Sequence, residues 1–121
     1  MAERRLRCRG QDRPRIVNLI KAVREDFDAP EAPFIIGTIG FHGWDMPEQF
    51  LPIAEAQLAV SNYEKYPQFK GKVHTVETRD FWQSAENSPM DQDYHYNQNG
   101  ETYYLIGDAF GKGIVQLLEE E

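Results

Sequence analysis

The polar segment from Asp91 to Gly100 holds the residues best suited to proton transfer. His95 lies within it, and histidine is the side chain whose unperturbed pKa is nearest to neutral. Asp91 and Asp93 precede it in the same segment. A carboxylate that accepts a hydrogen bond from one ring nitrogen fixes the tautomer and leaves the other nitrogen free for catalysis. The sequence therefore offers His95 as a catalytic base with Asp93 or Asp91 as its acid partner. The alternative is a solvated loop histidine beside a helix cap.

A second group of candidate residues follows the apolar segment at 34–41. His42, Trp44 and Asp45 could bind a sugar, the indole by stacking and the polar groups by hydrogen bonds. Tyr94, beside His95, invites the same interpretation. The alternative for these residues is a glycine-containing turn whose tryptophan packs over the core.

The three histidines do not form a metal-binding pattern. His42, His74 and His95 are far apart in the sequence and show none of the short ligand spacings of zinc sites. We therefore expect no metal, and no cofactor motif is found.

Periodicity predicts alternating helices and strands. Apolar residues recur at helical spacing in three segments, and two short β-branched segments lie between them. The helices are expected near 14–27, 48–63 and 101–118, and the strands at 34–41 and 73–78. This order predicts a parallel sheet with helical crossovers, in which ligands bind beyond the carboxyl ends of the strands. The loops that hold His42 and His95 both follow strand ends, so they should share one rim.

The helix ends and the last helix can be predicted in more detail. Asp12 can cap the first helix, and Asn97 or Asn99 can cap the last. Gly107 and Gly111 should allow a close approach of the last helix to a neighbour. Its buried stripe is expected to consist of Tyr103, Ile106, Phe110, Ile114 and Leu117.

Length and composition fit one small soluble domain. The net charge of −7 argues against nucleic acid and anionic membranes as partners. No apolar run approaches the length of a membrane span, and the chain does not start with a signal-peptide pattern. Cys8 is the only cysteine, so it cannot form an internal disulfide and says little about the cellular compartment.

Residues 1–15 differ in composition from the rest. They hold six arginines against Glu3 and Asp12, a local balance of +4 that leaves −11 for the remaining residues. So few apolar residues cannot offset the entropy of ordering. We expect a basic tail unrelated to the domain at 16–121; the alternative is a basic arm for an acidic partner.

Most of the domain resembles the C-terminal part of the sialate O-acetylesterase and acetylxylan esterase family, a branch of the SGNH hydrolases. The likeness rests on Pro33-Phe-Ile-Ile-Gly-Thr-Ile-Gly40, on Lys72 to Trp82, on Tyr94-His-Tyr-Asn97 and on Glu101 to Gly111. It implies a three-layer α/β/α, flavodoxin-like parallel sheet, of which this chain is a partial C-terminal segment. It also implies that His95 is the base of a serine esterase, and that acetylated carbohydrate is the substrate. Such relatives are often secreted.

Two departures from that family matter. Its nucleophile lies in a Gly-Asp-Ser or Gly-Gln-Ser turn after the first strand, whereas this chain has only Ser61, Ser84 and Ser88, none in such a turn. The family usually has an aspartate three residues before the histidine, where this chain has Gln92. The acid is then Asp93 or Asp91, or it comes from outside the chain.

Two functional classes follow. The chain is either part of a carbohydrate O-acetylesterase that is inactive alone, or a non-catalytic α/β domain that binds a glycan or a partner chain through the same rim. An α/β sheet without its first strands exposes an edge, so we also expect self-association through that edge.

Overall fold

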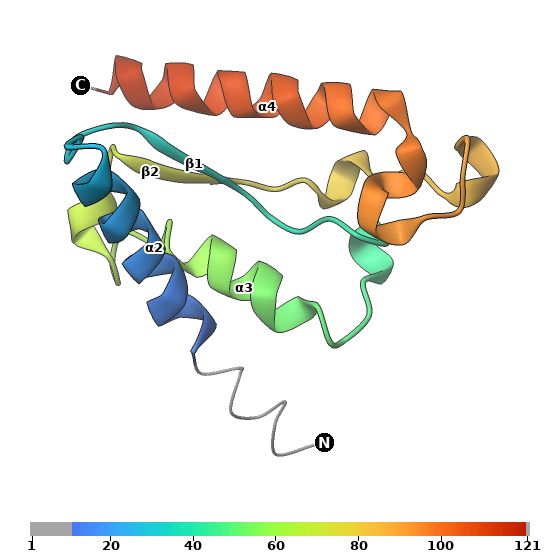
Figure 1. Cartoon of the computed structure of the whole chain (residues 1–121), viewed down its shortest axis with the longest axis horizontal. Helices are drawn as coiled ribbons and strands as arrows, with labels where there is room; N and C mark the ends of the chain where they lie inside the picture. The colour runs from blue at the N-terminus through green and yellow to red at the C-terminus, as the bar shows by residue number, and fades with distance from the viewer. Residues whose placement is uncertain (1–10, 121) are drawn as a thin grey trace.

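A computed structural model describes residues 11–120 of the chain. Two strands, β1 (Phe34–Gly37) and β2 (Val73–Val76), pair in parallel, with Phe34 opposite Val73. Helix α4 (Gly100–Glu119) covers one face of this sheet, and helices α2 (Asp12–Asp26) and α3 (Leu51–Ala59) lie on the other (Figure 1). The prediction of a parallel α/β arrangement is confirmed for these two strands.

The main core lies between β2 and the helices α2 and α3. Ile20, Val60, Phe69 and Val73 are almost completely buried there. Ile20 comes from the apolar stripe expected for the first helix, but Leu19 and Phe27 of the same stripe are exposed.

Side chains cover the outer edge of β2. Phe34 N–H donates to the Lys72 carbonyl and Thr38 N–H to that of Val76, so the carbonyl of Val73 points away from β1. The Tyr63 hydroxyl donates to this Val73 carbonyl at 2.6 Å. Further along, the Thr75 hydroxyl donates to the Gln57 carbonyl at 2.6 Å.

Helix α4 begins at its predicted cap. The Asn99 side chain accepts a hydrogen bond from Thr102 N–H at 3.1 Å, which satisfies one of the free amides of the first turn. Helix α2 differs from its prediction, because Gln11 is the residue before it and no side chain caps it. Asp12 is therefore its first helical residue rather than its cap. Residues 12–15, which we assigned to the basic tail, are helical, whereas residues 1–10 lie outside the described part.

The buried face of α4 agrees only in part with the predicted one: Leu117 is buried, Ile106 and Phe110 are half-buried, and the Phe110 ring lies against Gly37. Tyr103 and Ile114 are exposed, and the face toward the sheet is centred on Thr102, Gly113 and Leu117. A Cβ on Gly113 would lie 3.2 Å from the side chains of His74 and Ile35. Gly113 is therefore the glycine that permits the close approach.

Within the described fold, Gly107 and Gly111 do not serve a close approach to a neighbour. A Cβ on either glycine would have nothing within 4 Å. The spacing of the large apolar residues set the predicted stripe, and it took no account of the small residues that let the helix lie close to the sheet.

Candidate functional site

The loops after β1 and β2 meet at one end of the sheet, where short 3-10 helices at Gly43–Asp45 and Arg79–Phe81 lie side by side (Figure 1). The second loop continues to Asn99 and holds His95 in a kinked segment at Asp93–Gln98, whose backbone is not helical at His95, Tyr96 and Asn97. As predicted, the two candidate segments share the rim at the carboxyl ends of the strands. We call this end of the molecule the rim.

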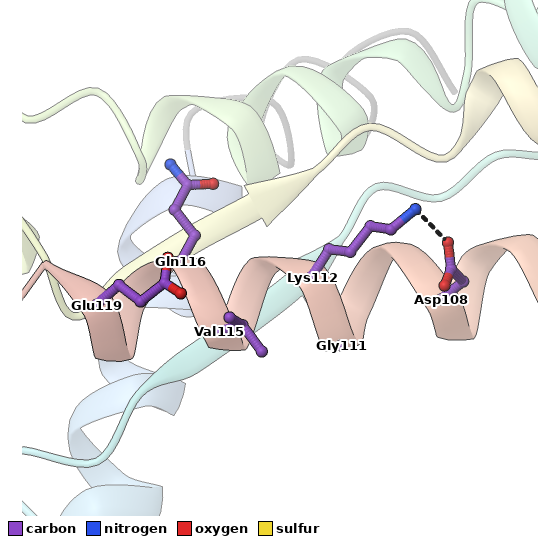
Figure 2. A pocket seen from close by; sticks show the side chains of 6 residues that line it. All are labelled: Asp108, Gly111, Lys112, Val115, Gln116 and Glu119. Carbon is purple, nitrogen blue, oxygen red and sulfur yellow. Dashed lines mark ion pairs between the residues drawn. The ribbon is translucent and has the colours of Figure 1, made fainter.

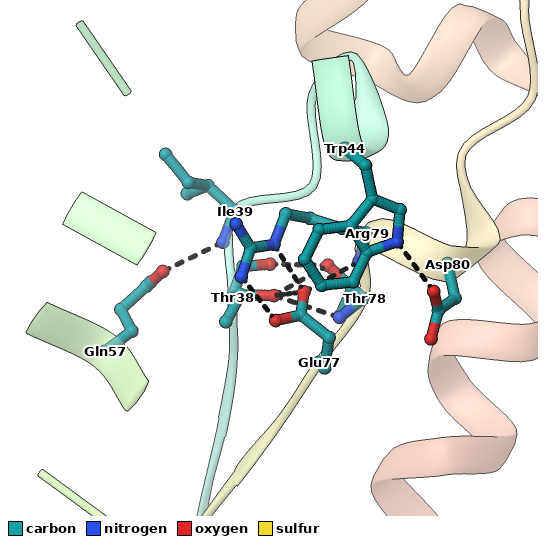
Figure 3. A network of polar contacts seen from close by, with 8 residues as sticks. All are labelled: Thr38, Ile39, Trp44, Gln57, Glu77, Thr78, Arg79 and Asp80. Carbon is teal, nitrogen blue, oxygen red and sulfur yellow. Dashed lines mark hydrogen bonds and ion pairs between the residues drawn. The ribbon is translucent and has the colours of Figure 1, made fainter. Parts of the chain in front are cut away.

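A buried polar network joins the strands just below the rim (Figure 3). Thr78 N–H donates to the Thr38 hydroxyl oxygen at 2.9 Å, and the Thr78 hydroxyl donates to the Thr38 carbonyl at 2.6 Å. The Thr38 hydroxyl lies 3.0 Å from a carboxylate oxygen of Glu77 and donates to it. The Thr38 hydroxyl oxygen thus accepts the Thr78 N–H hydrogen bond that a backbone carbonyl would accept in a regular parallel ladder. This explains why β1 ends at Gly37 and not at the predicted residue 41.

Glu77 is held by Arg79 in a bidentate pair. The Arg79 Nε–Oε1 distance is 2.8 Å and the Nη2–Oε2 distance is 2.7 Å, and the Arg79 backbone N–H also donates to Oε1. Burial by itself would raise the pKa of Glu77, but the hydrogen bonds from Arg79 and Thr38 outweigh it and lower that pKa. The same pair raises the pKa of Arg79. The sequence analysis missed this pair, although a Glu-x-Arg spacing at a strand end was visible.

Trp44 is exposed at the rim but fixed in place. Its indole N–H donates to Asp80 at 2.7 Å, and the Arg79 guanidinium lies 4.2 Å from the centre of its ring (Figure 3). The indole is 62% exposed despite these contacts, so it presents a rigid aromatic surface to solvent. Asp45, predicted beside it, is also exposed.

His42 joins the two loops. Its Nε2 lies 2.9 Å from a carboxylate oxygen of Asp93, and its ring lies against Trp82 with 5.3 Å between centroids. Its backbone is left-handed, with φ of 64°. That conformation is uncommon for a residue with a Cβ and suggests a local functional or packing constraint. Asp93, predicted to orient His95, is instead paired with His42.

His95 is exposed at the rim. Its backbone N–H donates to the Gln92 carbonyl, and its own carbonyl accepts a hydrogen bond from the Tyr103 hydroxyl at 2.8 Å. No hydrogen bond or ion pair of the His95 ring is found among the described residues. Asp91 is exposed as well. The structure therefore places the predicted residues at one rim but does not join His95 to either carboxylate, and its catalytic role stays a prediction.

The backbone beside His95 is strained and is held by a buried asparagine side chain. Tyr96, Asn97 and Gln98 all have φ between 50° and 55°, the left-handed region. Asn97 is buried, and its side chain accepts from Gln92 N–H at 2.7 Å and donates to the Gln83 carbonyl at 3.1 Å. Such left-handed residues persist only where the surrounding contacts determine them, and they concentrate at functional sites.

Aromatic rings form one wall of the rim. Phe41 packs edge-on against Tyr94, with 5.4 Å between centroids, and against Phe50. The Tyr96 hydroxyl accepts a hydrogen bond from Gly40 N–H at 3.2 Å. Tyr94, a predicted binding residue, remains largely exposed above this wall. The sequence analysis missed Phe41 and Phe50, because only the turn between them showed a polar signal.

Two further general features concern residues 11–120. These residues contain no group of three or more His, Cys, Asp or Glu residues arranged to hold a metal ion. In the same part of the chain, no helix has the length and apolar character required to cross a membrane.

Comparison of the chain with protein-family models, curated proteins and solved structures finds no match.

Proposed function

We propose that this chain supplies the histidine loop and one wall of the substrate pocket in a serine esterase that removes O-acetyl groups from carbohydrates. The proposed fold is the three-layer, flavodoxin-like arrangement of the SGNH hydrolases. Residues 16–121 would be its C-terminal part. The observation that carries the proposal is the exposed His95 at the carboxyl ends of parallel strands, on a loop whose backbone is fixed by buried Asn97.

The nucleophile must come from outside this sequence, because its three serines all have structural partners. The Ser61 hydroxyl lies 2.7 Å from that of Thr75. Ser88 donates to the Ser84 carbonyl at 2.7 Å and lies 3.1 Å from the Asn99 amide nitrogen. None stands in a strand-to-helix turn that would expose it for attack.

In the proposed reaction, the serine oxygen attacks the carbonyl carbon of the acetyl ester while His95 takes its proton. His95 then gives that proton to the sugar oxygen as the C–O bond breaks, which leaves an acetyl-serine. Water, deprotonated by His95, attacks the acetyl group in turn and releases acetate and free serine. One histidine thus acts as base and acid in both halves of the reaction.

Asp93 receives a different role from the one expected. Its carboxylate is 2.9 Å from His42, so we assign it to holding the two loops together. The group that orients His95 is then Asp91 or a carboxylate of the serine-bearing part. Trp44, exposed and fixed by Asp80, is the surface we assign to a sugar ring.

The test begins with the DNA upstream of the coding sequence, read in all three frames for a Gly-Asp-Ser or Gly-Gln-Ser turn. The chain of 121 residues should hydrolyse an activated acetyl ester barely faster than free imidazole, because it lacks serine and oxyanion donors. A chain extended to include the serine turn should be active. His95→Ala should lower kcat/KM of that enzyme by about 1,000-fold or more without changing its melting temperature.

His74→Ala is the matched control, because His74 lies on β2 against Gly113 rather than at the rim. It should leave kcat/KM within a few fold. Asp93→Asn should cost much less than His95→Ala if Asp93 only ties the loops. An extended enzyme indifferent to His95→Ala would disprove the catalytic assignment.

A non-catalytic glycan-binding domain is the second candidate, and the exposed, fixed Trp44 favours it. This candidate is supported if several hundred bases of upstream DNA hold no serine turn. Trp44→Ala should then abolish retention on acetylated glycan while His95→Ala leaves it unchanged.

A further inference from the structure

The outer face of α4 is apolar although it points away from the sheet. Tyr104, Gly107, Gly111, Val115 and Leu118 follow one another at helical spacing along this face, and the three large side chains are 50–74% exposed. We call these five residues the outer stripe. Around Gly111 and Val115 the surface is hollowed, and charged side chains border it (Figure 2). A helix that is apolar on both sides is normally buried on both sides.

The two glycines of the outer stripe have no function within the described fold. Nothing lies within 4 Å of where their Cβ atoms would be. Glycine inside a helix costs about 0.5–1 kcal/mol relative to alanine. Gly113, in contrast, is required by its contacts with His74 and Ile35. Since glycine permits close approach of another backbone, the outer stripe is shaped for a partner that packs against the α4 backbone itself.

We infer that the outer stripe binds a second copy of this chain, with the two α4 helices antiparallel and crossing at Gly111. A two-fold axis through Gly111 brings together residues equally far before and after it. Tyr104 then faces Leu118, and Gly107 faces Val115. The stripe is thus complementary to itself, with a large side chain opposite a glycine and two large apolar side chains opposite each other.

The charges beside the outer stripe fit the same arrangement. Asp108 and Lys112 lie on one flank and pair with each other at 2.7 Å (Figure 2). The two-fold axis keeps the flank and reverses the direction, so each Lys112 lies near Asp108 of the second copy, offset by about 3 Å along the helix. The two Lys112 side chains lie equally close to each other across the axis, so the charges run Asp108, Lys112, Lys112, Asp108, and two contacts of opposite sign outnumber one of like sign. In a parallel pair the same residues would face their own kind.

The contact area is that of a weak dimer. It involves one helix of each copy, which is small for a stable complex, and Glu101 and Glu119 meet on the same flank near its ends. The apolar stripe must supply most of the free energy. We expect a dissociation constant on the order of 100 µM.

Sedimentation equilibrium of the full chain at about 10 to 1,000 µM, a range that spans this constant, tests the inference. The chain should shift from monomer to dimer without larger species. Val115→Glu should raise the dissociation constant by about tenfold or more, because it buries a charge opposite Gly107. Leu118→Glu should act in the same direction. Leu19→Glu, an equally exposed leucine on α2, is the matched control and should leave the constant unchanged.

Gly111→Ala separates the proposal from a simple folding effect. Alanine is the better helix former, so the melting temperature of the dilute monomer should rise. The added methyl groups meet at the two-fold axis, so the dissociation constant should also rise. Structural damage would instead lower the melting temperature of the dilute monomer, whatever its effect on the dissociation constant.

The register has its own test. In a chain that also carries Cys8→Ser, Gly111→Cys should form a covalent dimer under mild oxidation, since disulfides need Cα atoms closer than about 7 Å. Leu19→Cys should cross-link far more slowly. A monomer at all concentrations would overturn the inference. An association that survives both Val115→Glu and Leu118→Glu would also overturn it, and would point to the sheet edge instead. A third contrary result would be a chain extended upstream in which the added residues cover α4.

Discussion

The loops after β1 and β2 reach the same rim but are held in different ways. The loop after β1 depends on its neighbour: His42 is tied to Asp93, and Trp44 to Asp80. The loop after β2 holds itself, because the buried side chains of Asn97 and Asn99 bond to the backbone of its own earlier residues. The loop that supports itself is the one that carries His95. Since Asp93, Tyr94 and Tyr96 also contact the first loop, we expect the geometry around His95 to depend on that loop less than on this internal support.

The largest loss of stability is expected from removing the internal support of the second loop. Asn97→Ala loses two hydrogen bonds, leaves Gln92 N–H and the Gln83 carbonyl without them, and places alanine at a φ of 54°. We expect the free energy of unfolding to fall by about 3 kcal/mol, measured by urea denaturation.

Asn97→Gly is its control. Glycine adopts the left-handed backbone without strain but loses the same two hydrogen bonds, so it should cost about 1 kcal/mol less than Asn97→Ala. A loss below about 1 kcal/mol for Asn97→Ala would show that the loop is supported elsewhere.

A smaller effect is expected from cutting the tie between the strand ends. Glu77→Gln removes the bidentate pair with Arg79 and should lower the free energy of unfolding by about 2 kcal/mol at neutral pH. The pKa of Glu77 is lowered in the folded state, so its ionised form stabilises the fold above the ordinary value of 4.5. That contribution is lost as the pH falls through the lowered pKa.

The difference between wild type and Glu77→Gln should therefore shrink on acidification below about pH 4.5. Chemical denaturation at several pH values measures it. Glu86→Gln, at an exposed position of the second loop, is the comparison variant. A difference that is independent of pH would mean that charge is not what stabilises the pair.

The smallest effect should follow from releasing the first loop. His42→Ala removes the half-exposed contact with the Asp93 carboxylate and the ring contact with Trp82, which together contribute about 1 kcal/mol. Amide NMR shifts should change at residues 41–45 and stay nearly constant at 96–99. A double-mutant cycle with Asp93→Ala should give a coupling of about 0.5 kcal/mol. Broad shift changes at 96–99 would contradict the expected minor dependence of the second loop on the first.

The elements could be predicted from the sequence where the signal was local. The apolar β-branched runs located β1 and β2, and an asparagine before an amphipathic run located the start of α4. The partner of Asp93 could not be predicted in this way, because it depends on left-handed residues in both loops that bring His42 across. Glycine adopts such left-handed conformations most readily, whereas here histidine, tyrosine, asparagine and glutamine adopt them.

The errors in α4 have a different cause. Its sequence is apolar on two sides, so periodicity alone could not say which side meets the sheet. The answer lay in Thr102 and Gly113, small residues that permit contact with the sheet. Of the large apolar residues predicted to be buried, Tyr103 and Ile114 are exposed beside the outer stripe, whereas Leu117 is buried.

Tyr63, whose hydroxyl donates to the Val73 carbonyl, limits which edge of the sheet can accept a further strand. A strand added beside β2 would have to displace the Tyr63 hydroxyl from that carbonyl and break a 2.6 Å hydrogen bond. Beside β1, at residues 34–37 of the described chain, no side chain makes such a bond. We therefore expect any further strand, from the same polypeptide or from another, to add next to β1 and to leave β2 at the border of the larger sheet.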